Sequence, residues 1–283
     1  MTTLTPPAAT TVGPPAPAPG GPAVAARMLG NETGKQARLL WRRRGLVIAG
    51  VFAAGTSYIL FRLLIEGGHV TAQMVGLTLP GLVLGYAFAA AAALQGAGDI
   101  AEEVLGGTLE QSQLSPARPS LLLAGRLIGL AGLGLAGAVV LGLVFGFGFG
   151  VHYTIRPDVL VPLLLTILDG LGYALLMTAL VLRVASTGAI VHVFNMAIMF
   201  FGGMTIPVSA FPHGVEIFAR FVPTTLGVEA VNTTLAGRGL GAAWSDGTLP
   251  WLIVHTVALG ALGWITYLHT LRRARREGGL SPR

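Results

Sequence analysis

The chain has 283 residues, of which 53% are hydrophobic and only 11% are charged, with a net charge of +6 and a mean hydropathy of +0.73. Soluble domains carry about 25% charged residues, so this composition excludes an ordinary soluble fold and indicates a protein embedded in a membrane. The absence of cysteine excludes disulfides and thiolate chemistry. The basic residues flank apolar segments, so membrane orientation explains them better than binding to nucleic acid does.

The N-terminal segment, residues 1–24, is rich in proline, alanine, threonine and glycine and has no charged side chain. Such a composition cannot bury a core, so we expect a disordered cytoplasmic tail. Residues 25–276 are expected to form one transmembrane domain, followed by a short cytoplasmic tail at 277–283. Residues 35–44 combine leucine and tryptophan with arginine, which predicts either a short interfacial helix or merely a charged flank.

Several apolar segments approach or exceed the length of about 20 residues that a membrane span requires. They lie at about residues 45–65, 74–95, 120–151, 159–184, 188–206 and 249–271. The expected fold is an all-α bundle of six transmembrane helices. Fourteen of the 18 basic residues fall at the termini or in the loops on the same side, so both termini are expected in the cytoplasm. The excess of arginine over lysine, with abundant alanine and glycine, is typical of a bacterium and favours its inner membrane.

Glycines recur at a spacing of four residues in two expected spans. Gly81 and Gly85 lie in the second span, and Gly125 and Gly129 lie in the third. This spacing lets helix backbones approach closely in lipid, either within one subunit or at a seam between two copies of the chain. The third span is too long for the bilayer at about 1.5 Å per residue, so it must tilt or extend beyond the membrane.

The loop between the second and third spans departs from the charge pattern expected on the cytoplasmic side. Asp99, Glu102, Glu103 and Glu110 face a single base, Arg118. Capping residues and two adjacent glycines predict two short helices here. An acidic helical hairpin with leucines on one face suits docking on another protein, and a solvated connector is the alternative.

The run EEVLGGTLEQSQLSP in this loop resembles the signature of type-2 ATP-binding-cassette (ABC) permeases, which include drug and antibiotic exporters. In that family the segment is a coupling helix seated in a cleft of a separate ATPase. Ser112 and Gln113 stand where the family usually has an apolar pair. The ATPase-coupling residues that the resemblance implies are Glu102, Glu103, Gly107, Thr108, Leu109, Glu110, Gln111, Ser115 and Pro116.

A second stretch resembles the same family. After the fifth expected span, the sequence FFGGMTIPVSAFP has a Gly-Gly pair and two prolines that interrupt a helix. In the family a short amphipathic re-entrant helix lies at this place, before the last span. The resemblance covers residues 35–276 and implies a permease that works as a homodimer with two ATPase subunits.

The sequence offers no catalytic motif. The nearest approach to a phosphate-binding loop, GNETGKQ at residues 30–36, has the wrong spacing and follows no strand. The six histidines are scattered without the spacing of metal ligands. We therefore expect a non-catalytic subunit that binds no cofactor or metal, with ATP and Mg²⁺ held by the partner ATPase.

Asp169 is the one acid expected well inside a span. Carboxylates at this depth are costly and often functional, so Asp169 and Asn195 are candidates for a substrate path. The alternative is a structural contact of Asp169 with Asn195, His192 or an arginine. His192, Asn195 and His255 are each expected to form hydrogen bonds between helices.

The expected function is export of a drug-like or hydrophobic small molecule through the lipid membrane, driven by a separate ATPase. A lipid or lipid-linked glycan is an alternative cargo. A proton-driven secondary transporter would need several acids along its path, and an integral-membrane enzyme would need convergent polar residues in the membrane.

Overall fold

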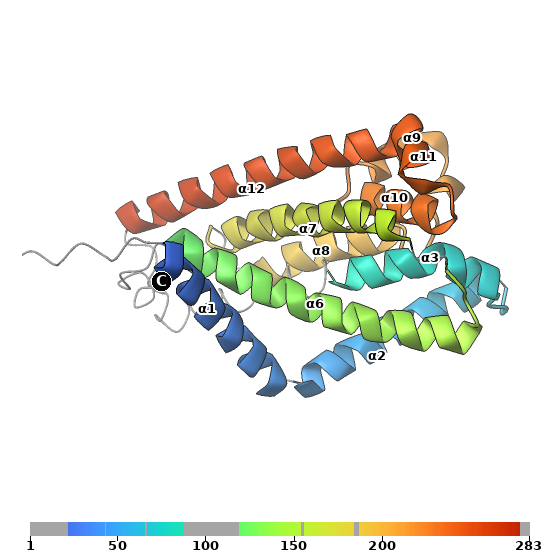
Figure 1. Ribbon diagram of the computed structural model, residues 1–283, viewed down its shortest axis with the longest axis horizontal. Helices are drawn as coiled ribbons and strands as arrows, with labels where there is room; N and C mark the ends of the chain where they lie inside the picture. The colour runs from blue at the N-terminus through green and yellow to red at the C-terminus, as the bar shows by residue number, and fades with distance from the viewer. Residues whose placement is uncertain are drawn as a thin grey trace, which may run out of the picture.

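The structure is a computed structural model that describes residues 22–42, 44–65, 67–87, 119–153, 156–183 and 187–277. All regular secondary structure within these ranges is helical. The helices that follow the long axis of the molecule alternate in direction along the chain (Figure 1). They are α2 (Arg44–Ile65), α3 (Ala72–Gly85), α6 (Pro119–Phe149), α7 (Leu160–Val181), α8 (Thr187–Phe201) and α12 (Thr248–Glu277).

Four segments of the described helices are long and apolar enough to cross a membrane. They are Ile48–Ile65, Leu127–Phe149, Pro157–Leu180 and Thr248–Arg273. Two shorter apolar segments, Ala72–Gly85 and His192–Phe201, belong to the helices expected as the second and fifth spans. The chain is thus a multi-pass helical membrane protein.

The fifth expected span ends earlier than predicted because of two glycines. α8 stops at Phe201, and Gly203 adopts a φ of 78°, a conformation that glycine reaches without steric cost. The predicted break at Gly202–Gly203 is therefore confirmed. Where one amphipathic helix was expected before the last span, the chain forms three helices, α9 (His213–Ala219), α10 (Thr225–Leu235) and α11 (Gly239–Ser245).

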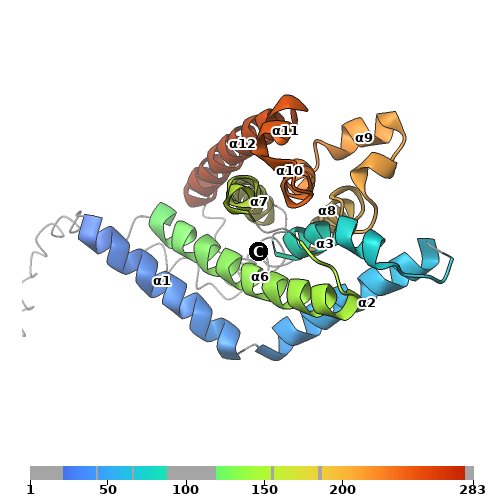
Figure 2. The same cartoon turned by 45° about the vertical axis from the view of Figure 1, so that its right-hand side comes forward.

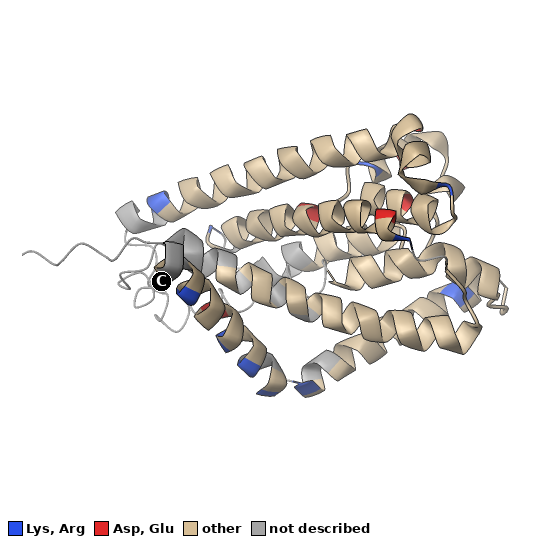
Figure 3. Ribbon diagram, in the orientation of Figure 1, with Lys and Arg blue, Asp and Glu red and all other residues tan. Residues whose placement is uncertain are grey.

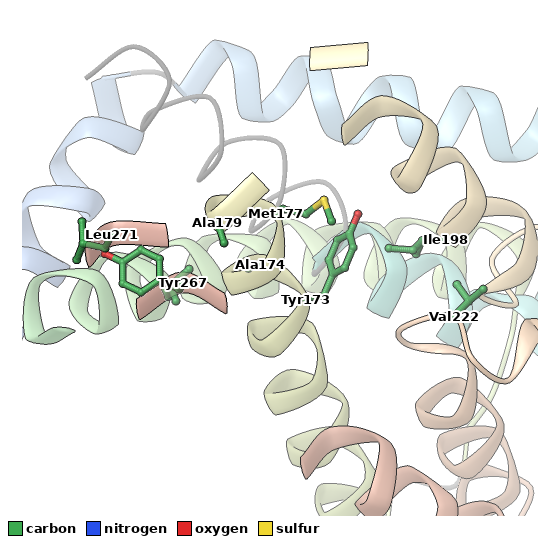
Figure 4. Packing of buried hydrophobic residues seen from close by; sticks show 9 residues of the cluster. Tyr173, Ala174, Met177, Ala179, Ile198, Val222, Tyr267 and Leu271 are labelled. Atoms are coloured by element: carbon green, nitrogen blue, oxygen red, sulfur yellow. The ribbon is translucent and has the colours of Figure 1, made fainter. Parts of the chain in front are cut away.

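The helix α7 is central to the bundle. Figure 2 shows it nearly end-on, with α12, α10, α3 and α6 around it. Glycines bring α7 and α12 together, because a Cβ on Gly172 would lie only 2.8 Å from the backbone nitrogen of Gly260. Tyr173 and Met177 then pack with residues of α8 and α12 in a buried apolar cluster (Figure 4).

The first described helix, α1 (Pro22–Arg42), is longer than the expected interfacial helix and begins inside the segment expected to be a tail. It packs along the N-terminal part of α6, where a Cβ on Gly129 would lie 2.7 Å from the Cβ of Gln36. Gly81 and Gly85 likewise face Gly203 and Met204 of the same chain. Gly125 faces Glu32 of α1, so all four glycines with the predicted spacing serve packing within one subunit.

The length of α6 follows from this contact. Its 31 residues span about 46 Å, and its apolar segment begins only at Leu127. α1 packs against the part that precedes this segment and against its first turn, at the end of the bundle where α12 terminates (Figure 1). The helix α6 is thus longer than its apolar segment, and whether it tilts in the membrane or extends beyond it stays a prediction.

Candidate functional site

The predicted coupling residues, from Glu102 to Pro116, lie outside the described residues. The described chain stops at Ala87 after α3 and resumes at Pro119, where α6 begins. The role of this loop stays a prediction. Asp169 and Asn195 are both described, and each has a different partner.

Asp169 lies on α7 with only 1% of its surface exposed. Its Oδ1 is 2.7 Å from Nδ1 of His255 on α12, and its Oδ2 accepts a hydrogen bond of 3.1 Å from the backbone N–H of Thr224. Nε2 of His255 lies 3.2 Å from the carbonyl oxygen of Phe221. These four residues, which we call the Asp169 cluster, join two long helices to the turn that precedes α10.

The proton arrangement in the Asp169 cluster follows from the partners. A carbonyl oxygen only accepts, so Nε2 of His255 carries a proton and donates it to Phe221. The Nδ1–Oδ1 contact holds one further proton, on the ring or on the carboxyl group. In both cases the pair has no net charge, which greatly lowers the cost of burying Asp169 in an apolar bundle.

Thr224 has a strained backbone. Its φ of 77° is the only positive φ of a non-glycine residue among those that the structure describes, and β-branched residues rarely adopt it. Such a conformation costs about 1–3 kcal/mol and persists only when the surroundings hold it. The hydrogen bond to Asp169 holds the Thr224 N–H, and the neighbouring Thr225 Oγ1 donates to the carbonyl of Phe201. The cluster thus fixes the start of α10.

Asn195 is hydrogen-bonded to a residue outside this cluster. The hydroxyl of Tyr173 donates to its Oδ1 at 3.4 Å, which ties α8 to α7. The expected partners of Asp169 were therefore wrong, and His255 takes their place. His255 itself makes the interhelical hydrogen bond expected of it. The signal in the sequence was that Asp169 and His255 lie within the apolar parts of two different helices, and ionisable residues inside a membrane segment favour pairing.

Another group of ionisable residues lies on the short helices α9 and α10. Nη2 of Arg220 is 2.9 Å from Oε1 of Glu216, and its Nε is 3.9 Å from Oε2 of Glu229. Burial raises the pKa of Glu229, and Glu216 and Asp246 raise it further, while Arg220 opposes the shift. Among the described residues, no group of three potential metal ligands occurs. The ionisable residues here form a mixed-charge surface network.

Comparison with known families identifies the chain. The model of the ABC-2 family transporter proteins matches residues 47–265, from α2 to α12. The chain belongs to the ABC-2 transporter family. A search of curated proteins finds no significant match.

Membership in the ABC-2 family makes the chain a membrane subunit of an ABC transporter and confirms the resemblance seen in the sequence. It implies association with an ABC ATPase subunit. The region that matches the ABC-2 family contains the Asp169 cluster and the predicted coupling loop, whereas α1 precedes it.

Proposed function

We propose that the chain is the permease subunit of an ATP-driven exporter that moves a hydrophobic small molecule out of a bacterial cell. Two copies would assemble with two ATPase subunits, and cargo would pass between the copies. ATP and Mg²⁺ would bind to the ATPase alone. A lipid or lipid-linked glycan is the alternative cargo.

The observation that carries this proposal is the ABC-2 family match over residues 47–265, which encloses the GTLEQ segment between α3 and α6. Transport by such a subunit needs a rigid element that passes movement of the ATPase to the membrane helices. The acidic residues and leucines of this segment suit that task, because carboxylates form strong hydrogen bonds with Arg or Lys of a partner.

The Asp169 cluster supports a hydrophobic cargo. Asp169 is buried and already neutralised by His255, so it offers no spare charge to a cation. The same pair is the feature that favours a proton-driven secondary transporter as the second candidate, because a buried carboxylate–histidine pair can exchange a proton.

The decisive experiment separates these two energy sources. The purified chain, alone and with its cognate ATPase, is reconstituted in liposomes, and uptake of a hydrophobic fluorescent compound is followed. We expect no ATP hydrolysis by the chain alone, and ATP-dependent transport by the complex that persists when the proton gradient is collapsed. Transport driven by a pH gradient without nucleotide would overturn the exporter and establish the secondary transporter.

The coupling segment has its own test. Glu110→Ala should weaken binding of the ATPase and abolish transport, because truncating one partner of a buried interfacial charge pair costs roughly 2–5 kcal/mol. Gln113→Ala in the same loop is the control and should bind normally. Co-purification of the ATPase measures both. Normal binding and transport in a variant that combines Glu110→Ala with Glu103→Ala and Leu109→Ala would show that the ATPase docks elsewhere.

We further propose six spans with both termini in the cytoplasm. The alternating directions of the long helices support this arrangement, as does the excess of basic residues at the α1 end of the bundle (Figure 3). Cysteines introduced as Ser112→Cys and Ser281→Cys should resist an impermeant thiol reagent in intact cells, and Ser245→Cys should react. Labelling of Ser112→Cys from outside would refute the span count.

A further inference from the structure

The C-terminal end of α3 adjoins the predicted coupling loop. Tyr86 and Ala87 follow the last residue of α3 and are the last described residues before α6 begins at Pro119. The backbone forms a π-helical turn at these two residues, a distortion that is frequent at functional positions. A movement of the loop therefore enters the bundle through this turn or through the start of α6.

The ring of Tyr86 occupies a slot between α2 and α6. A Cβ on Gly137 of α6 would lie 2.7 Å from Cε1 of this ring, and a Cβ on Gly50 of α2 would lie 3.0 Å from its hydroxyl oxygen. Both distances are shorter than an ordinary contact between heavy atoms, so each glycine makes room for the ring. Because the ring is in close contact on both sides, a displacement of Tyr86 must displace α2 or α6 with it.

A hydrogen bond farther along α3 forms a second link to α2. The hydroxyl groups of Tyr58 and Thr78 lie 2.6 Å apart, and both residues are buried. Gly50 precedes Tyr58 by eight residues, and Thr78 precedes Tyr86 by the same number. At about 1.5 Å per residue, the two links are about 12 Å apart along these antiparallel helices. α3 cannot tilt or slide against α2 without breaking one of them.

A different side of α3 is in contact with the break that follows α8. Gly81 and Gly85 face Gly203 and Met204 so closely that a Cβ on either helical glycine would overlap them. Gly203 and Met204 begin the segment that leads to the short helices α9, α10 and α11. α3 is therefore held by α2 and α6 on one side and by this segment on another.

We propose that Tyr86 is a positioning residue of the transport cycle, which passes a movement of α3, started by the ATPase at the coupling loop, to α2 and α6. This role rests on the proposed function, because it requires an ATPase that docks on the loop. A large ring between two glycines transmits a displacement well, because neither facing residue has a side chain that could rotate out of the way. The place of Tyr86 next to the loop makes it the first such contact of α3.

The test measures the coupling between ATP hydrolysis and transport. The complex with the cognate ATPase is reconstituted in liposomes, and uptake of the hydrophobic fluorescent compound at saturating concentration is divided by the ATP hydrolysed in the same sample. Tyr86→Ala should leave ATPase binding and ATP hydrolysis in place but lower uptake per ATP roughly 2- to 30-fold, the range for substitutions that weaken coupling between distant sites. Tyr86→Phe keeps the ring in the slot and should keep this ratio.

Glycine variants test the slot without removing the ring. Gly137→Ala places a Cβ 2.7 Å from the ring and should also lower uptake per ATP, whereas Gly146→Ala on the same helix, with nothing within 4 Å, should not. In the Tyr86→Ala background, Gly137→Ala should cause no further fall, because the ring that it would meet is gone. Additive effects of the two substitutions would show that the contact between them has no role.

Another tyrosine provides the control for lost packing. The hydroxyl of Tyr153 donates a hydrogen bond of 2.7 Å to the carbonyl of Gly76, so it joins the segment after α6 to the first half of α3. Tyr153→Ala should lower the Tm and leave uptake per ATP unchanged. An unchanged ratio in Tyr86→Ala, or in Gly137→Ala where Tyr86→Ala does not fold, would overturn the proposal, as would an equal loss in Tyr153→Ala. Absence of ATP-driven uptake by the wild type would overturn the proposed function itself, and this role of Tyr86 with it.

Discussion

Replacing His255 by alanine should destabilise the protein far more than replacing Asp169 by asparagine. His255→Ala leaves a carboxylate that is 1% exposed with only the Thr224 N–H as a partner, and breaking a buried ion pair in this way costs about 3–5 kcal/mol. Asp169→Asn keeps an oxygen for Thr224, and its amide can donate to Nδ1 of a ring protonated only at Nε2. All three hydrogen bonds survive, so the expected cost is about 1 kcal/mol or less.

The coupling between the two residues can be measured directly. Asp169→Ala leaves the Thr224 N–H and Nδ1 of His255 without their partner. Each unsatisfied buried group lowers the stability of the fold by about 1–3 kcal/mol. Either single substitution already breaks the contact between Asp169 and His255. In the double alanine variant, the second substitution therefore costs less than it does alone. The double variant should therefore be more stable than the sum of the two single effects predicts, by on the order of 2 kcal/mol.

The assay is thermal unfolding in detergent, with transport measured on the same variants. At about 2–4 °C per kcal/mol, His255→Ala should lower the Tm on the order of 10 °C, and Asp169→Asn by a few degrees at most. Equal Tm values for wild type and His255→Ala, or strict additivity in the double variant, would refute the structural role of the pair. Lost transport by Asp169→Asn at an unchanged Tm would place Asp169 in the substrate path.

Three further predictions concern single positions. Gly129→Ala should loosen α1 and expose it to proteolysis, because the added Cβ meets a side chain at 2.7 Å, whereas Gly132→Ala, with nothing within 4 Å, should not. Burial raises the pKa of Glu229, so its ionisation opposes folding, and stability should fall as pH rises from the ordinary value of 4.5 through the raised one. Glu229→Gln should remove that fall in a series of Tm measurements across pH. Thr224→Gly should keep or raise the Tm, because glycine relieves the positive φ and Oγ1 has no partner among the described residues, whereas Thr225→Ala should lower it through a lost hydrogen bond.

Hydropathy predicted two of the long helices closely, because a span is decided by its own composition, whereas α12 continues to Glu277, six residues beyond the expected limit. α2 and α6 begin and end within two residues of the expected limits. The prediction was weaker where backbone conformation intervenes. α8 ends at Phe201, and the segment that follows divides into three helices whose boundaries depend on turns such as that at Thr224. A positive φ at a threonine contradicts local preference, so no local pattern could indicate it.

The length of α1 was also missed. Its middle contains Gly30, Asn31 and Gly34, which favour turns over helix, and the helix has no long apolar stretch. The helix forms because the N-terminal part of α6 offers Gly125 and Gly129 as a surface for it. Tertiary packing supplies most helical stability in such a segment, so local propensity underestimated it.

The partner of Asp169 depends on how α7 and α12 cross. Gly172 faces Gly260 and Gly263, and this contact between small residues fixes both the separation and the register of the two helices. Asp169 lies one turn before Gly172, and His255 lies somewhat more than one turn before Gly260. A shift of α12 by one residue would rotate His255 by about 100° and carry it away from the carboxylate. Asp169 could be singled out from composition alone, since an acid inside an apolar helix needs a partner, but which residue meets it is set by glycines that carry no charge.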